Sequence, residues 1–226
     1  MKKLLCLVLC LCLLPLPVRG AAEEKLVALT FDDGPSGRFT RRLLDGLGAE
    51  NAHATFLLCG YRIEQYPELV ERILKEGHEI GLHGYSHNPM EKMTPEQITA
   101  ELKITGSLLP ENAQVRFVRT PGGAITDDIL EVAEEMGLSV LLWSVDPRDW
   151  ATEDSQTIEA AVLDTVRDGD VILLHDMSDS SVDAALSVLK KLKSQGFRFV
   201  TVSELTKLRH ISPEPGTMYS RFPKKE

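Results

Sequence analysis

Apolar and polar positions follow two different patterns along the chain. Short apolar runs bounded by polar turns predict buried strands, and segments with apolar residues at helical spacing predict helices that cover them. Their alternation is typical of strand and helix units repeated around a parallel sheet. Seven runs are candidate strands: Leu26 to Phe31, Ala54 to Cys59, Glu79 to Leu82, Val115 to Arg119, Ser139 to Ser144, Val171 to His175 and Arg198 to Val202. Seven strands with interleaved helices favour a single-domain α/β fold, a distorted (β/α) barrel, over an open sheet.

Capping signals mark several of the predicted helices. A helix from Pro67 to Glu76 ends at a glycine, and Thr94, Pro95 and Gln97 form the signature of a capping box. The other three predicted helices span residues 126–137, 157–167 and 182–194. The folded core therefore covers about residues 26–208, and the tail 211–226, rich in proline and charge, is expected to be irregular.

Residues 1–20 form a different kind of segment. Two lysines precede an apolar run from Leu4 to Leu14, and small residues around Gly20 offer a cleavage site. Because prolines and Arg19 interrupt the run before it reaches about 20 residues, we interpret the segment as a signal peptide rather than a membrane span. We expect a secreted or extracytoplasmic protein with one mature domain, residues 21–226, and an uncleaved anchor is the weaker alternative.

Charge and cysteine content narrow the possible partners. The net charge of −9 becomes −12 when the leader, with its three basic residues, is removed. An acidic surface disfavours nucleic acid and anionic membranes, which are bound mainly through Lys and Arg, and is compatible with a neutral or cationic sugar polymer. Cys59 is the single cysteine after the leader, so we expect no internal disulfide, and we expect a monomer.

Chemically distinctive residues gather where the predicted strands end. In a (β/α) barrel the carboxyl ends of the strands share one face, where catalytic groups are assembled. We therefore expect five segments to form one site: Asp32-Asp33, His83 to His87, Arg119, Asp146 to Trp150 and His175-Asp176.

Two of these segments together have the composition of a metal site. His83 and His87 are four residues apart, which on a helical turn or in a tight loop directs both imidazoles at one centre. With Asp33 they make a set of two histidines and one carboxylate, which leaves positions open for water and substrate, as a catalytic zinc site requires. Alone, each pattern has a structural interpretation, an Asp-Gly-Pro turn and an ordinary histidine pair, and their combination favours the metal.

Five motifs in this order resemble the polysaccharide deacetylase family, family four of the carbohydrate esterases. They are Thr-Phe-Asp-Asp-Gly-Pro at 30–35, the histidine pair after Gly-His-Glu-Ile-Gly, Arg119-x-Pro121-x-Gly123, Asp146-x-x-Asp149-Trp150 and Leu173-Leu174-His175. The resemblance runs from about residue 26 to residue 205. It implies that residues 21–226 are a catalytic domain that removes N-linked acetyl groups from an amino-sugar polymer, peptidoglycan or a chitin-like glycan, with a cell-wall association.

The resemblance also implies the roles of the metal ligands and the base. Asp33, His83 and His87 would bind one divalent metal, with zinc expected and cobalt as an alternative. Asp32 would be the general base that activates water. Arg119 would pair with Asp32 and keep it ionised, a role suited to a rigid guanidinium.

The acid and the substrate pocket follow from the same resemblance. His175 would protonate the leaving amine, and Asp149 would orient its ring and favour the imidazolium form. Gly122, Trp150 and Leu173 would line the pocket that binds the substrate. The family often has an aromatic residue where this chain has Gly122, so the catalytic backbone N–H is kept and the polymer preference is left open.

Two alternatives to the N-deacetylase differ in chemistry. An O-acetyl esterase acting on xylan would use the same machinery, although an amine leaving group needs protonation by His175 more than an alkoxide does. A catalytically silent glycan-binding relative would lack a base, a ligand or the acid, and this chain has all of them. His175 and Asp32 therefore favour the amide hydrolase.

Overall fold

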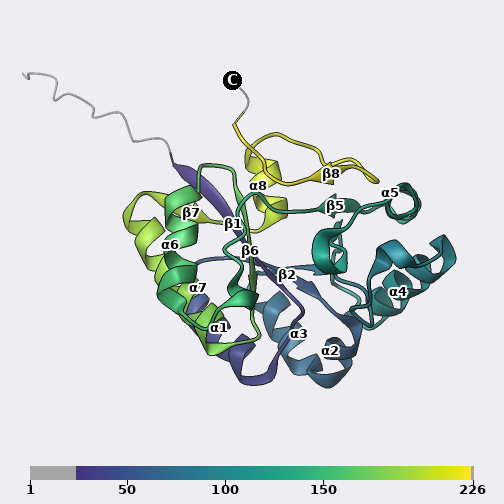
Figure 1. The fold of residues 1–226 in the computed structure, drawn as a ribbon, viewed down its shortest axis with the longest axis horizontal. Coiled ribbons are helices and arrows are strands. Elements are labelled where there is room, and N and C mark those ends of the chain that lie inside the picture. The colour runs from purple at the N-terminus through teal and green to yellow at the C-terminus, as the bar shows by residue number, and fades with distance from the viewer. Residues whose placement is uncertain (1–23, 225–226) are drawn as a thin grey trace, which may run out of the picture.

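Parallel strands form the centre of the protein, as the apolar runs in the sequence predict (Figure 1). The structure, a computed structural model, describes residues 24–224. In chain order the strands are β1 Lys25–Asp32, β2 Thr55–Leu58, β3 Glu79–Leu82, β4 Phe117–Val118, β5 Ser139–Leu141, β6 Val171–His175, β7 Phe197–Phe199 and β8 Met218–Tyr219. They pair in the order β6-β1-β2-β3-β4-β5-β8, and β7 pairs with the start of β1.

The sheet curls until its two sides meet. The segment that follows β5 forms a parallel bridge from Val145 to Ile172 of β6, and the N–H of Leu173 donates to the Val145 carbonyl at 3.0 Å. Strand β1, buried along its length after Lys25, is flanked by β6 on one side and by β2 and β7 on the other. The predicted distorted barrel in a single domain is confirmed.

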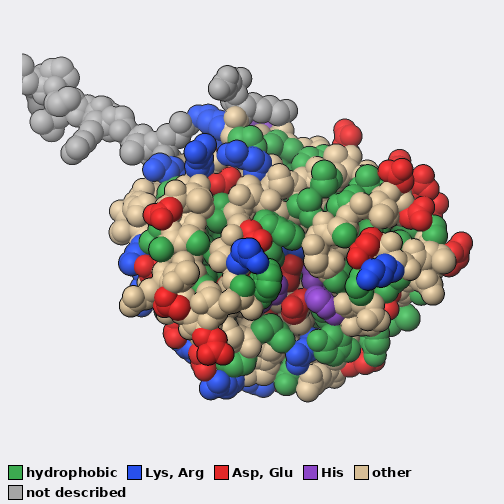
Figure 2. All heavy atoms as spheres, in the orientation of Figure 1, with side chains coloured by type: hydrophobic (Ala, Val, Ile, Leu, Met, Phe, Trp, Pro, Cys, Tyr) green, Lys and Arg blue, Asp and Glu red, His purple; other side chains and the backbone are tan. Residues whose placement is uncertain are grey.

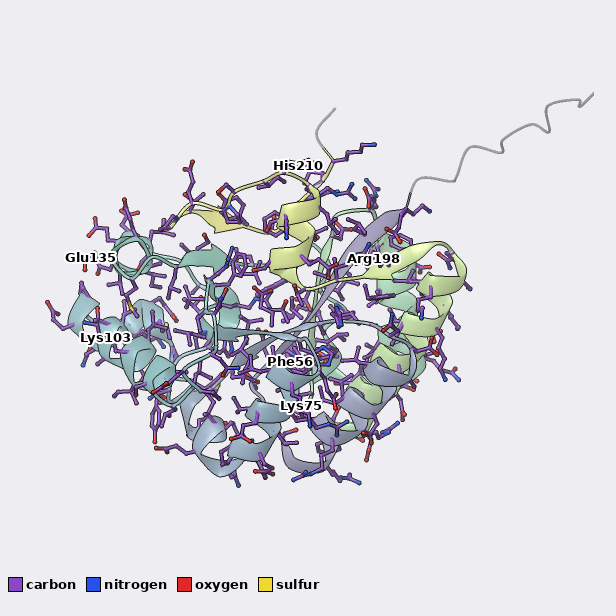
Figure 3. All side chains as sticks on the ribbon, turned by 180° about the vertical axis from the view of Figure 1, so that it is seen from behind. Phe56, Lys75, Lys103, Glu135, Arg198 and His210 are labelled. Atoms are coloured by element: carbon purple, nitrogen blue, oxygen red, sulfur yellow. The ribbon has the colours of Figure 1, made fainter. Side chains whose placement is uncertain are left out.

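Eight helices among the described residues cover the barrel. They are α1 Gly37–Ala49, α2 Gly60–Gln65, α3 Pro67–Lys75, α4 Pro95–Ser107, α5 Asp127–Glu135, α6 Ser155–Thr165, α7 Asp179–Ser194 and α8 Val202–Leu208, with short 3-10 turns at Met90–Lys92, Pro121–Gly123 and Asp149–Ala151. Helices α1, α6 and α7 pack on one flank, and α4 packs beside α5 on the other (Figure 1). Seen from behind, His210, just after α8, lies at the top of the molecule, and Lys75, the last residue of α3, lies in its lower half near Phe56 of β2 (Figure 3).

The predicted caps begin two of these helices. Thr94 accepts a hydrogen bond from the N–H of Gln97, and the Gln97 side chain accepts one from the N–H of Thr94 at 2.9 Å, which completes the capping box of α4. Thr126 accepts from the N–H of Ile129 at the start of α5. Local side-chain chemistry therefore fixes where both helices start, as the sequence indicates.

The last predicted strand, Arg198 to Val202, is partly wrong. Strand β7 ends at Phe199, and Val202 is already the first residue of α8. The reason is a cap: the Thr201 hydroxyl accepts the N–H of Glu204 at 3.1 Å and turns the chain into a helix. An apolar run alone cannot distinguish a buried strand from a buried helix start.

The tail after Ile211 is less irregular than the sequence indicates. Met218–Tyr219 pairs with β5 as strand β8, and Phe222 is fully buried in the apolar cluster that contains Leu26 and Val200. The ring of Phe222 stacks on Tyr219 at 5.5 Å between centroids. A proline-rich and charged composition hides this packing, because two apolar residues suffice to attach the tail.

The predicted signal peptide, residues 1–20, lies outside the described residues. Within residues 24–224, no helix has the length and apolar character of a membrane span.

Candidate active site

Polar side chains collect where the carboxyl ends of the strands meet. The pairing of β1 with β6 sets Asp32 opposite His175, and Figure 2 shows histidine and acidic side chains together in a depression near the centre of one face. The cavity there has a volume of about 380 Å³. The residues to which the sequence assigns a role line this cavity except Arg119 and Asp149, which lie behind two of them. Asp176, which the sequence places in the same cluster, is buried and does not line the cavity.

Asp33, His83 and His87 bring three potential ligand atoms together. Nε2 of His83 lies 3.2 Å from Asp33 Oδ1, and Nε2 of His87 lies 2.9 Å from the same oxygen. All three atoms lie within 4.8 Å of one another, and no other group of this kind occurs among residues 24–224. The spacing is that of side chains arranged around a common centre.

Two loops with unusual backbone conformations carry these ligands. Asp33, just after β1, has a φ of 70°, and His87, in the loop after β3, has a φ of 60°. His83 and His87, four positions apart, are therefore brought together by a tight loop rather than by a helical turn. Glu101 of α4 holds this loop, because its carboxylate accepts the N–H groups of Tyr85 at 2.7 Å and Ser86 at 2.8 Å. Sequence analysis missed Glu101, which acts through backbone contacts that no motif reveals.

The donor set fits a divalent cation. Nδ1 of His83 lies 2.8 Å from the carbonyl oxygen of Arg119, so this nitrogen carries the proton and the Nε2 lone pair faces Asp33. Asp33 Oδ1 is buried and has no hydrogen-bond partner. A bare imidazole nitrogen beside a bare carboxylate oxygen is stabilised by a shared cation. Burial raises the pKa of Asp33, but the imidazoles of His83 and His87 outweigh burial and lower this pKa, which favours the ionised ligand.

Arg119 holds Asp32 from behind. The guanidinium is fully buried and donates to Asp32 Oδ1 at 2.6 Å and to Thr30 Oγ1 at 2.9 Å. Two further N–H groups donate to the carbonyls of Leu141 and Leu142 at 2.9 and 2.8 Å. These hydrogen bonds hold the guanidinium rigid, and the guanidinium in turn fixes Oδ1 of Asp32. The other oxygen, Oδ2, lies 3.9 Å from Nε2 of His83.

Asp149 orients His175 on the other side of the cavity. Its carboxylate lies 2.8 Å from His175 Nδ1 and accepts the backbone N–H of His175 at 2.8 Å. His175 Nε2 then points into the cavity, 4.0 Å from Asp33 Oδ2. Burial lowers the pKa of His175, but the hydrogen bond and charge of Asp149, with smaller contributions from Asp32 and Asp33, outweigh burial and raise this pKa to about 9.

A comparison with known families decides what kind of protein carries this arrangement. Residues 19–141 match the family model described as polysaccharide deacetylase. This chain belongs to the polysaccharide deacetylase family. A peptidoglycan-N-acetylglucosamine deacetylase of Bacillus cereus is 40% identical to it over 195 residues, covering 83% of this chain and 91% of that protein. The peptidoglycan-N-acetylmuramic acid deacetylase PdaC of Bacillus subtilis is 39% identical over 189 residues, and the alignment spans only 40% of PdaC.

Solved structures of polysaccharide deacetylases share the fold. The structure of PdaC has a TM-score of 0.79 at 37% identity and covers 83% of this chain and 93% of that one. A family 4 acetyl xylan esterase from Clostridium thermocellum, solved in complex with a cobalt ion, has a TM-score of 0.82 at 34% identity, covering 88% of this chain and all of that one. The likeness therefore extends over most of the barrel.

Three further residues line the cavity of this polysaccharide deacetylase: Thr120, Trp143 and Asp146. Trp143 escaped sequence analysis because the predicted strand 139–144 ends at Leu141, and the following residues turn toward the site. Gly123 permits the approach of this ring, since a Cβ there would lie 2.5 Å from Trp143. The one feature of the sequence that could have indicated Trp143 as a site residue is the position of an aromatic residue just after a strand.

Gly122, where the family often has an aromatic side chain, occupies an open position. Its φ is 72°, in the left-handed region that favours glycine, and nothing lies within 4 Å of a Cβ placed there. Leu173 is almost fully buried, whereas Trp150 is 63% exposed and stands at the rim. A second cavity of about 500 Å³ shares Asp33, Trp150 and His175 with the first, so open space continues past the rim.

Proposed function

We propose that this polysaccharide deacetylase hydrolyses N-linked acetyl groups of an amino-sugar polymer in a metal-dependent reaction. One observation carries the proposal: three ligand atoms lie together between a carboxylate and an imidazole, and each of these two groups is oriented by a buried ion pair. Amide hydrolysis needs a base for water, stabilisation of an oxyanion and an acid for the amine, and the cavity supplies a group for each.

The metal that we propose is zinc, with cobalt as an alternative. Two imidazoles and one carboxylate suit either ion, and a relative was solved with cobalt. When bound by Asp33, His83 and His87, a divalent cation would polarise the acetyl carbonyl and lower the pKa of water. The hydrogen bond from His83 Nδ1 to the Arg119 carbonyl supports a metal at this position, because it directs Nε2 toward the cation.

Asp32 is the general base in this proposal. Its carboxylate is paired with Arg119 through Oδ1, which leaves Oδ2 to accept a proton from the attacking water. Because Arg119 and Asp32 are both buried, loss of either partner would leave an unpaired charge in the interior. The pair therefore ties the orientation of the base to the integrity of the fold.

His175 is the proposed acid. A pKa of about 9 keeps its imidazole protonated at neutral pH, so it can donate the Nε2 proton to the departing sugar nitrogen. Asp149 accepts a hydrogen bond from the Nδ1–H of the ring, so Nε2 is the nitrogen that faces the cavity. An amine leaves readily only after protonation, which favours amide over ester substrates.

We infer that the substrate is the glycan of peptidoglycan, and that the protein works outside the cytoplasm at the cell wall. Two relatives are named for peptidoglycan, one for its N-acetylglucosamine and one for its N-acetylmuramic acid. Gly122, Trp150 and Leu173 would contact the sugar and its acetyl group, and the adjoining cavity would receive a neighbouring unit of the polymer. The leader, interpreted as a signal peptide, supports the location.

Acetate release tests the proposal. Purified protein would be assayed with peptidoglycan, N-acetylated chitooligosaccharide and acetylated xylan, before and after treatment with a chelator. We expect release from an N-acetylated glycan, loss on chelation and recovery with zinc or cobalt. Faster release from xylan would identify an O-acetyl esterase instead, and release that survives complete metal removal would contradict the proposed mechanism.

A further inference from the structure

Asp176 is a buried acid that the proposed reaction does not use. It follows His175 directly and is fully buried. Its Oδ2 accepts the hydroxyl of Thr40, and its Oδ1 has no hydrogen-bond partner. Asp176 does not cap the next helix, because Ser178 caps α7 by accepting the N–H of Ser181 at 3.1 Å.

A carboxylate in this environment destabilises the fold. Burial raises the pKa of Asp176 to about 6, and the hydrogen bond from Thr40 and the charge of His175, which lower this pKa, do not outweigh burial. A buried polar atom without a partner loses its hydrogen bonds to water without forming new ones, which destabilises the folded state. Asparagine or an apolar residue of similar size would be easier to bury, so the acid must contribute something other than stability.

Asp176 contacts the loop that carries the metal ligand Asp33. The Ser36 hydroxyl donates to the Asp176 carbonyl, and the N–H of Ser36 donates to Thr40 Oγ1 at 2.7 Å. A Cβ added to Gly34 would lie 2.5 Å from Asp176 Oδ1, so the carboxylate lies directly against the loop. The carboxylate therefore lies against the second residue of the loop and reaches the fourth through Thr40, while the Asp176 backbone carbonyl contacts the fourth directly.

This loop needs external support. Asp33 adopts a φ of 70°, a region that residues other than glycine adopt only when the surroundings impose it. One restraint comes from β2, where the N–H of Cys59 donates to the Gly34 carbonyl at 3.1 Å. The hydrogen bonds that join Ser36, Thr40 and Asp176 supply the restraint on the side of β6 and α1.

We propose that Asp176 is a positioning residue that holds the loop 33–36 in the conformation in which Asp33 converges with His83 and His87, at the expense of fold stability. The inference rests on the metal site of the proposed function. In this proposal, Asp176 lowers the stability of the metal-free fold and raises the metal affinity. A residue with a merely structural role would change both in the same direction.

Glu79 provides a matched control at the other end of the barrel. It is also a buried carboxylate, at the start of β3, but both of its oxygens are hydrogen-bonded: Oε2 accepts from Thr55 at 2.8 Å and from the N–H of Ser203 at 3.0 Å, and Oε1 accepts from the Ser203 hydroxyl. None of these partners belongs to a loop that carries a ligand. Its role is to join β2, β3 and α8.

The test compares Asp176→Asn, Thr40→Val and Glu79→Gln with the wild type. Zinc and cobalt dissociation constants would be measured by competition with a chromophoric chelator, the Tm would be measured on metal-free protein, and kcat and KM would be measured with excess zinc. We expect Asp176→Asn to weaken metal binding about tenfold or more, as loss of outer-shell support typically does, while the metal-free Tm stays level or rises. Glu79→Gln should lower the Tm and leave metal affinity unchanged.

Thr40→Val keeps the shape of the side chain and removes the hydroxyl that joins Ser36 to Asp176. It should weaken metal binding in the same direction, and it decides the question if Asp176→Asn does not fold. Wild-type metal affinity in both variants would overturn the inference, and so would a fall in Tm with affinity retained. Because metal binding is measured without substrate, failure of all glycans as substrates would count against the proposed function and leave this test intact.

Discussion

The Asp149 carboxylate makes the largest contribution that raises the pKa of His175. Burial alone would hold the imidazole below its ordinary pKa of 6.5, and the hydrogen bond and charge of Asp149 raise it to about 9. A group whose pKa is raised in this way is protonated below that value and loses its proton as the pH rises through it. If His175 acts as the acid, catalysis should fail on the alkaline side.

Asp149→Asn should therefore move the alkaline limb of the pH profile to lower pH. The amide can still accept a hydrogen bond from Nδ1, but the charge that favours the imidazolium is gone. The measurement is kcat/KM against pH with an N-acetylated chitooligosaccharide. Glu153→Gln, at the wall of the adjoining cavity, is the control and should leave the limb in place. An unmoved limb in Asp149→Asn would show that another group titrates there.

Asp32 and His83 should fail in different ways when replaced. Asp32→Asn removes the proposed base and keeps the hydrogen-bonding shape beside Arg119, so we expect turnover to fall by about 10²- to 10⁴-fold with metal content retained. His83→Ala removes one of three ligands, so metal and activity should be lost together. Zinc content by atomic absorption, measured beside acetate release, distinguishes the two. Loss of metal in Asp32→Asn would mean that Asp32 is itself a ligand.

At the scale of elements, the turn Pro121–Gly123 brings the third motif to the cavity. Its two glycines differ in what a side chain at each position would contact. Both have a positive φ, 72° at Gly122 and 73° at Gly123, so alanine is strained at either position. Only at Gly123 would the new methyl group meet a side chain, the ring of Trp143 at 2.5 Å. Backbone strain and ring displacement can therefore be separated.

Gly122→Ala should cost about 1 to 2 kcal/mol of stability, the penalty of a left-handed conformation, and should lower kcat/KM less than Gly123→Ala does. Gly123→Ala should cost more and should also lower kcat/KM, because Trp143 must move away from the cavity wall. Urea denaturation and steady-state kinetics of both variants check this. Equal kinetic effects would indicate that the position of Trp143 does not matter to the reaction.

The predictability of the elements depended on whether local chemistry decides their structure. Strands β3 and β6 begin and end where their apolar runs do, and the α4 capping box follows from Thr94 and Gln97. Helix α1 was not predicted, because it contains three glycines and has no side-chain cap, and it is held instead by burial of three leucines, Leu43, Leu44 and Leu47. Tertiary packing outweighs propensity there, and no local pattern reports it.

The same division applies to the candidate site. The proposed ligands, base and acid follow strand ends, so their convergence could be predicted from sequence once a barrel was inferred. The supports could not: Glu101 acts through backbone N–H groups of another loop, and Trp143 lines the cavity only because β5 ends early. Side chains that act through tertiary contacts have no sequence signature of their own.

At the scale of the whole molecule, chemistry and stability occupy opposite ends of the barrel. The cavity lies at the carboxyl ends of the strands. The tail pairs with β5 through β8, and its last part attaches near the amino end of β6, where the N–H of Phe222 donates to the Gly169 carbonyl at 2.7 Å. Gly169 has a φ of 84°, and a Cβ there would lie 2.4 Å from the Phe222 carbonyl oxygen. The tail is thus fitted closely to the strand ends away from the site.

Phe222→Ala should therefore separate stability from activity. The ring is fully buried among apolar side chains, and its removal should lower the free energy of unfolding by about 3 to 5 kcal/mol. Phe222→Leu keeps most of the apolar volume and should cost less. At temperatures well below the Tm, both variants should keep wild-type kcat/KM and metal affinity, because the cavity and its ligands receive no contact from the tail among the described residues. Urea denaturation, zinc titration and acetate release on the same preparations would measure the stability, the metal affinity and kcat/KM. A loss of metal affinity in the folded Phe222→Ala protein would show that the two ends of the barrel are coupled.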